Sequence, residues 1–125
     1  MILLDTCVLL QWQAGRLSTA AHRRMVNAAT HEAPLWISAV SLFEVGNLAR
    51  LGRLGRRATA ALRAVESAPI HILDITADIA RVAHDMPDQL RDPCDRLIVA
   101  TAYALDCPLA TTDRIIIETA FVKTV

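Results

Sequence analysis

Four acidic residues with the right chemistry for a metal site are spread along the chain: Asp5, Glu44, Asp95 and Asp113. Carboxylates gathered in one place repel one another and raise one another's pKa unless a cation neutralises them. Hard oxygen ligands with no histidine nearby suit Mg²⁺ or Mn²⁺. Such an ion activates water and stabilises charge on a scissile phosphate, so the four acids, if they meet, predict phosphodiester hydrolysis.

The elements that would position these acids alternate between strand and helix. Apolar segments predict strands over 2–4, 35–37, 70–75, 109–112 and 120–125. Helices are predicted over 6–13, from a Ser18 cap to about 30, from a Ser38 cap to about 51, over 56–67, from a Thr76 cap to about 84, and over 94–105 after Asp92-Pro93. This order predicts one domain over 1–125 with an α/β fold, in which helices cover both faces of a mostly parallel sheet.

The predicted topology brings the four acids to one edge of the sheet. Right-handed crossovers place the carboxyl ends of parallel strands together, and ligands bind there. Asp5 and Asp113 directly follow strands, and Glu44 lies two turns into a helix that itself follows a strand. Asp95 occupies the first turn of the helix that Asp92 caps. The sequence therefore predicts an acidic site at this edge.

Each acid also has a structural interpretation. Asp95 and Glu44 could each complete a capping box near the start of their helices. Asp5 could be a helix cap, and Asp113 an ordinary turn residue. Placement of all four at the same edge favours the metal site.

Other phosphate-binding classes are excluded by particular residues. A haloacid-dehalogenase phosphatase needs a second Asp two positions after the first, where this chain has Cys7. A receiver domain needs paired acids after the first strand and a lysine in the site, whereas the only lysine is Lys123. The four glycines form neither a GxxxxGK nor a GxGxxG loop.

The composition is that of a well-filled globular domain, because 54% of the residues are hydrophobic and 21% are charged. No apolar run approaches the roughly 18 residues of a membrane span, so no membrane partner is predicted. The first residues lack signal-peptide features, and the three cysteines have neither zinc-site spacing nor a CxxC pair. A cytoplasmic protein with reduced thiols is expected.

Four segments resemble the PIN-domain ribonucleases in order and spacing. They are LLDTCVLL at 3–10, ISAVSLFEV at 37–45, RDPCDRLIVATA at 91–102 and LATTD at 109–113. The third segment is the most specific, and the resemblance covers essentially the whole chain. Within that family, a small single domain with a DPxDR block is similar to the VapC-type toxins of bacterial toxin-antitoxin systems.

The resemblance implies a PIN-like three-layer α/β/α sandwich that cleaves RNA endonucleolytically with Mg²⁺ or Mn²⁺. It implies that Asp5, Glu44, Asp95 and Asp113 are the catalytic, metal-binding acids. No side-chain nucleophile is needed, because the metal activates water.

Four more residues accompany the acids. Thr6 matches the hydroxyl residue beside the first acid, and Thr111 matches the polar residue before the last one. Arg96 matches the family pattern, either as a structural ion-pair partner or as an RNA contact. Asp92 is interpreted as a helix cap.

Two cysteines depart from the family pattern. Cys7 replaces the usual polar or His residue after Asp-Thr, and Cys94 replaces the usual Phe or Ala. Neither change removes a carboxylate, so activity is still expected.

The resemblance also implies partners. These are an RNA substrate, a cognate antitoxin, a second copy of the chain in a homodimer, and DNA only indirectly through the antitoxin. Segments 18–30 and 38–67 are rich in Ala and Leu and suit a groove for an amphipathic antitoxin segment. The alternative is a catalytically silent PIN-like module that acts only as a binding partner in a DNA-bound regulatory complex. The intact set of four acids argues against it.

Charges are unevenly distributed along the chain. Residues 6–65 carry eight arginines and two acidic residues, whereas residues 66–125 carry five basic and ten acidic residues. An acidic site repels RNA, so basic groups must flank it. The candidates for RNA binding are Arg50, Arg53, Arg56 and Arg57. A solvated helix face is an equally good interpretation of these arginines.

Overall fold

A parallel sheet forms the centre of the computed structural model, which describes all residues except 30–33, 56–58, 61–62, 64 and 66. The strands are β1 (Ile2–Leu4), β2 (Leu35–Ser38), β3 (Ile70–Leu73) and β4 (Leu109–Ala110). Their order is β3-β2-β1-β4, and every pair is parallel. Leu3 of β1 lies in register with Trp36 and with Leu109, so β1 is central.

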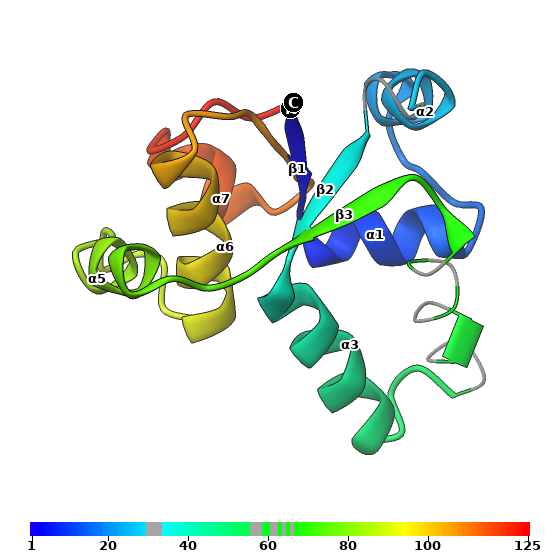
Figure 1. Cartoon of the computed structure of the whole chain (residues 1–125), viewed down its shortest axis with the longest axis horizontal. Helices are drawn as coiled ribbons and strands as arrows, with labels where there is room; N and C mark the ends of the chain where they lie inside the picture. The colour runs from blue at the N-terminus through cyan, green and yellow to red at the C-terminus, as the bar shows by residue number, and fades with distance from the viewer. Residues whose placement is uncertain (30–33, 56–58, 61–62, 64, 66) are drawn as a thin grey trace.

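Helices cover both faces of this sheet. They are α1 (Thr6–Gln13), α2 (Ala20–Asn27), α3 (Ala39–Arg50), α5 (Ala77–His84), α6 (Pro93–Ala104) and α7 (Arg114–Thr119). In Figure 1, α5, α6 and α7 lie on one side of the strands, and α1, α2 and α3 lie on the other. The predicted fold class, a three-layer α/β/α sandwich with a parallel sheet, is confirmed.

Two apolar cores follow from the alternation of side chains along β1. Leu3 packs in a cluster with Ile98 of α6 and Ile116 of α7. The next residue, Leu4, points to the opposite face and packs in a cluster with Val8 of α1. A strand buried on both faces must be apolar throughout, which explains the short run Ile2–Leu4.

Side-chain caps fix where the described helices other than α1 begin. Thr76 accepts from the backbone N–H of Ile79 at 3.2 Å, and Ser38 accepts from that of Val40 at 3.3 Å, as predicted. The predicted Ser18 cap is wrong. Thr19 caps α2 instead, and the Ser18 hydroxyl donates to Gln11 Oε1 at 3.2 Å.

The C-terminal segment differs most from the prediction. β4 is shorter than the predicted strand over 109–112, and α7 was not predicted at all. Asp113 caps α7, and Ala120, with a left-handed φ of 49°, ends it. The predicted strand over 120–125 is wrong, because this segment contributes only an isolated parallel bridge between Leu109 and Thr124.

Two further observations complete the fold. The predicted helix over 56–67 lies largely outside the described residues. Among the helices that the structure describes, none is long and apolar enough to cross a membrane.

Candidate metal centre

Carboxylates converge at the carboxyl ends of the strands, as the topology predicts. The pKa of Asp95 is raised to about 7. Burial is the largest cause, and the negative charges of Asp92, Asp5, Glu44 and Asp113 add to it. The four predicted acids therefore lie close enough to act on one another. Asp92 is a fifth member of the group, which the interpretation of this residue as a helix cap did not include.

Asp5 is held by a network rather than by helix capping. Its side chain is only 4% exposed, and it makes no cap bond although the residue stands at the N-cap of α1. Thr111 Oγ1 donates to Asp5 Oδ2 at 2.6 Å, and Cys7 Sγ donates to the same oxygen at 3.0 Å. Thr111 also accepts from the backbone N–H of Asp113 at 3.0 Å, so it connects the first and last acids.

Glu44 is oriented by Thr6, whose hydroxyl donates to Glu44 Oε2. The Thr6 hydroxyl is buried and lies 3.0 Å from Ser41 Oγ, which fixes it against α3. Burial raises the pKa of Glu44, the Thr6 bond opposes that shift, and the charges of Asp5 and Asp92 add to it. Thr6 therefore supports a carboxylate on a different element from its own.

Two of the acids are also helix caps. Asp92 Oδ1 accepts from two backbone N–H groups of α6 at 2.8 and 3.2 Å, which confirms its predicted role. Asp113 Oδ1 does the same for α7 at 2.7 and 3.2 Å, so Asp113 is more than an ordinary turn residue. In both residues the hydrogen bonds within the described chain use Oδ1 alone, which leaves Oδ2 for a ligand. No return bond from Asp95 completes a capping box within the described chain.

Arg96 has a structural role, and it forms no ion pair with any residue that the structure describes. All five of its guanidinium N–H groups donate to backbone carbonyls at 2.8 to 3.1 Å. The acceptors lie at the end of α5 and in the following loop: Ala83, His84, Met86, Pro87 and Leu90. These bonds hold that loop against the start of α6, where Asp92 and Asp95 lie, and leave no N–H for RNA.

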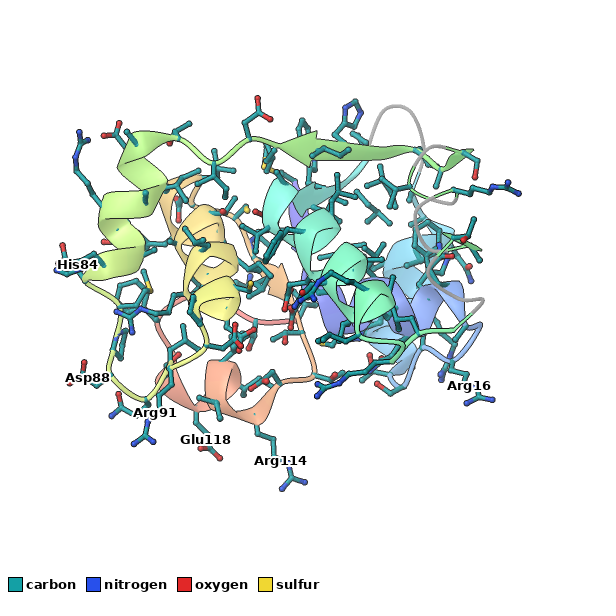
Figure 2. All side chains as sticks on the ribbon, turned by 90° about the horizontal axis from the view of Figure 1, so that it is seen from below. Arg16, His84, Asp88, Arg91, Arg114 and Glu118 are labelled. Atoms are coloured by element: carbon teal, nitrogen blue, oxygen red, sulfur yellow. The ribbon has the colours of Figure 1, made fainter. Side chains whose placement is uncertain are left out.

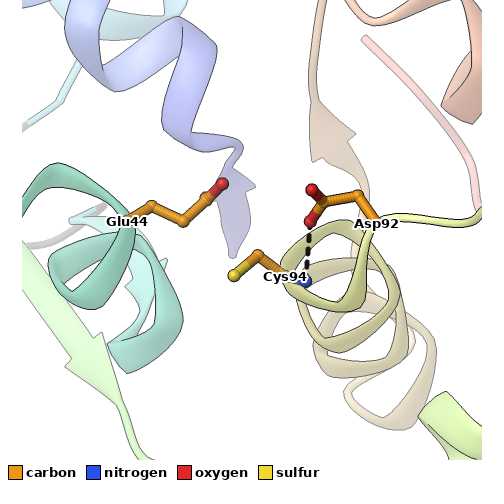
Figure 3. A group of neighbouring side chains, drawn as sticks. All are labelled: Glu44, Asp92 and Cys94. Atoms are coloured by element: carbon orange, nitrogen blue, oxygen red, sulfur yellow. Dashed lines mark hydrogen bonds between the residues drawn. The ribbon is translucent and has the colours of Figure 1, made fainter. Parts of the chain in front are cut away.

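Both cysteines that depart from the family pattern border the acids. Figure 3 shows the Cys94 side chain on the side of Glu44, and one ligand atom each of Glu44, Asp92 and Cys94 lies within 4.8 Å of the others. Burial raises the pKa of Cys94 to about 11, assisted by the charges of Glu44, Asp92 and Asp95. Burial and the charge of Asp5 raise the pKa of Cys7 to about 11 as well.

Among the described residues, no ion pair compensates the negative charge of this site. Within the described part of the chain, the one ion pair joins Arg81 to Asp78, on α5. No basic side chain is among the charges that shift the pKa of Asp95 or Glu44. Oxygen donors with net negative charge are the ligands that Mg²⁺ and Mn²⁺ require, so the residues fit a divalent cation.

The predicted RNA-binding arginines are only partly described. Arg50 and Arg53 are exposed, and the Arg50 guanidinium donates to Asn47 at 2.8 Å. Arg56 and Arg57 lie outside the described residues. Two other arginines, which the sequence analysis did not single out, stand next to site acids in the chain. Figure 2 shows Arg91 and Arg114 extending outward on the same side of the molecule, and both are exposed.

Residues 2–122 match the model of the PIN domain, so the chain belongs to the PIN-domain family. Solved structures with the same fold include VapBC2 from Rickettsia felis bound to a promoter DNA fragment. It matches with a TM-score of 0.76 and 15% identity, over 100% of this chain and 98% of that one. FitAcB from Neisseria gonorrhoeae matches with a TM-score of 0.71 and 20% identity, over 99% and 96%.

A third similar structure is VapC20 from Mycobacterium tuberculosis, a toxin that cleaves the sarcin-ricin loop. Its TM-score is 0.70 and its identity 20%, over 98% of each chain. No match was found among curated proteins. At these identities the structural matches establish the fold.

Proposed function

We propose that this PIN-domain protein is a metal-dependent endoribonuclease toxin of the VapC type. The observation that carries the proposal is the group of carboxylates at the carboxyl ends of the strands, none of which is in an ion pair with a described residue. Holding such a group together without a cation costs stability, so its presence favours a metal-dependent reaction. A catalytically silent binding module would have no use for it.

Asp5, Asp95 and Asp113 would hold the main ion, and Glu44 would complete the site. Mg²⁺ or Mn²⁺, when bound, supplies Lewis acidity and an activated water at neutral pH. The protein holds the metal-binding carboxylates in position before the ion binds. Thr111 and Thr6 hold Asp5 Oδ2 and Glu44 Oε2 in place, so that the opposite oxygens can face the ion. Arg96 keeps the start of α6 in position.

RNA would reach this site with its phosphates contacting exposed arginines. Arg91 and Arg114 are well placed for this, because each is adjacent in the chain to a site acid and extends into solvent. Arg50 and Arg53 would extend the same contacts along α3 and beyond. Such contacts position the substrate without reading its sequence.

A cognate antitoxin would neutralise the toxin in the cytoplasm. The structural relatives support this partner, because they include a toxin-antitoxin complex from Klebsiella pneumoniae and FitAB bound to a DNA fragment. DNA would be contacted through the antitoxin, and the toxin would form a homodimer. An apolar groove of about 440 Å³ is lined by Met25 of α2, by Ala28 just after that helix, and by residues of β1 and β2 that include Trp36. It is a suitable surface for an apolar antitoxin segment.

The test is cleavage of a structured RNA by the purified protein, with RNA ends mapped by sequencing. Cleavage should require Mg²⁺ or Mn²⁺, stop with EDTA and be absent in Asp5→Asn. Asp78→Asn, which changes an exposed acid on α5, is the matched control and should cleave normally. A folded wild-type protein that binds a cognate antitoxin but cleaves no RNA with either metal would favour the silent module.

A further inference from the structure

A sulfur and two carboxylates from two helices converge at one side of the acidic site. Glu44 comes from α3, whereas Asp92 and Cys94 come from the start of α6. One ligand atom of each lies within 4.8 Å of the other two (Figure 3). A zinc ion binds sulfur at about 2.3 Å and carboxylate oxygen at about 2.0–2.2 Å, so small side-chain rotations would let one ion contact all three atoms.

The donor atoms of this group remain available. Asp92 uses Oδ1 for helix capping, and Glu44 uses Oε2 for its bond with Thr6. Within the described residues, Cys94 Sγ makes no hydrogen bond. Cys7 provides a contrast, because its Sγ donates to Asp5 at 3.0 Å and lies 3.4 Å from the Thr112 hydroxyl. The Cys94 thiol thus lies near two carboxylates and has no hydrogen-bond partner among the described residues.

We propose that Cys94, Glu44 and Asp92 form a mixed sulfur and oxygen subsite that binds a thiophilic divalent cation of the zinc class. Mg²⁺ prefers six oxygen ligands in octahedral geometry and gains little from sulfur. Zinc-class ions accept thiolate and carboxylate together in tetrahedral geometry, with water as the fourth ligand. This inference rests on the proposed metal centre and extends it, because Cys94 would decide which metals the site prefers.

Co²⁺ is the appropriate probe, since it occupies zinc sites and its bonds to sulfur produce a near-ultraviolet charge-transfer absorption. Titrating Co²⁺ into the reduced wild-type protein should produce this band, and Zn²⁺ should displace it. The band should be lost in Cys94→Ser. It should persist in Cys7→Ser, whose thiol also borders a carboxylate, and in Cys107→Ser, whose thiol is buried and does not belong to the group of Glu44, Asp92 and Cys94.

The affinities for Zn²⁺ and Mn²⁺ provide a second measurement that does not depend on RNA cleavage. Cys94→Ser should bind Zn²⁺ about 10- to 100-fold more weakly, whereas its Mn²⁺ affinity should change by less than about threefold. Retained Mn²⁺ binding also demonstrates that the variant is folded. A band that persists in Cys94→Ser, or its absence from a wild-type protein that binds Mn²⁺, would overturn the mixed subsite and leave an all-oxygen centre. A wild-type protein that binds Co²⁺ through sulfur but neither binds Mn²⁺ nor cleaves RNA would support the subsite and contradict the proposed nuclease function.

Discussion

The two ends of the sheet differ sharply in chemistry. At the carboxyl ends of the strands, buried polar side chains such as Asp5 and Thr111 are joined by short hydrogen bonds. At the amino ends, Ile2, Leu35 and Trp36 line an apolar groove with Met25 of α2. The same strands build both ends.

This difference indicates that the carboxyl ends of the strands carry groups that reduce the stability of the fold and serve its function. Burying a carboxylate is costly unless it is paired or binds a metal, so evenly apolar strand ends would give a more stable protein. Apolar side chains at the amino ends carry no such cost and leave a surface suited to another protein. We therefore expect changes at the carboxyl end to alter chemistry, and changes at the amino end to alter association.

The largest expected effect is that of Asp95→Asn. Removing one carboxylate from the metal centre should reduce RNA cleavage by at least about a hundredfold. Without metal, the variant should melt at a higher temperature than the wild type, because repulsion among the acids falls. Cleavage rates and thermal melting in EDTA check the two parts. Normal cleavage by Asp95→Asn would remove this residue from the site.

Arg96→Gln should have the next largest effect, on stability. Five backbone carbonyls lose a charged donor, and we expect the free energy of unfolding to fall by about 2–4 kcal/mol in urea titrations. Arg81→Gln is the matched control, because it breaks an exposed pair on α5 and should cost less than about 1 kcal/mol. Equal effects of the two changes would contradict the structural role of Arg96.

The pH dependence of stability should reveal the raised pKa of the Asp95 carboxyl. Its pKa is raised from 3.8 to about 7 in the folded protein, so the folded state binds this proton more tightly than the unfolded state does. In EDTA, the stability from this group is complete below about pH 4 and is lost as the pH rises through about 7. Partial exposure to solvent reduces the effect to the order of 1–2 kcal/mol.

Comparison with Asp95→Asn isolates this contribution from other titrating groups. The difference in melting temperature between the two proteins in EDTA should grow from pH 5 to pH 8, in favour of the variant. Mn²⁺ affinity of the wild type should increase over the same interval, because protons compete with the metal. A difference that does not change with pH would show that Asp95 has no raised pKa.

At the apolar end, Ala28→Glu should weaken antitoxin binding by about tenfold while leaving metal affinity unchanged. Ala28 lines the groove and is exposed, so the new charge should not unfold the domain. Asn27→Glu, at an exposed neighbour that does not line the groove, is the control for added charge. Binding to the co-expressed antitoxin, measured by calorimetry, distinguishes them. Equal affinities would place the antitoxin elsewhere.

Local signals predicted most of the fold. The strand at 2–4, the helix over 6–13 and the Asp92 cap are as predicted, because each depends on neighbouring residues. The six-residue helix α7 was missed because its run of β-branched residues, Ile115–117, favours a strand, whereas the Asp113 cap decides the outcome.

The convergence of the acids was predictable from the sequence, but the side chains that bond to or border these acids were not. Parallel topology alone brings Asp5, Glu44, Asp95 and Asp113 to one edge. The bond from Thr6 to Glu44 joins residues 38 positions apart, so no local pattern indicates it. The same holds for Cys94, whose proximity to Glu44 depends on how α3 and α6 pack together.

The central claim is that the carboxyl end of the sheet is a divalent-metal centre, and metal-induced stabilisation tests it most directly. Above the Asp95 pKa of about 7, Mn²⁺ at a hundredfold excess over its dissociation constant should stabilise the wild type by about 2.7 kcal/mol. Asp5→Asn should gain far less, and Asp78→Asn should gain as much as the wild type. A wild-type melting temperature that Mn²⁺ and Mg²⁺ leave unchanged, or an equal gain in Asp5→Asn, would contradict the account.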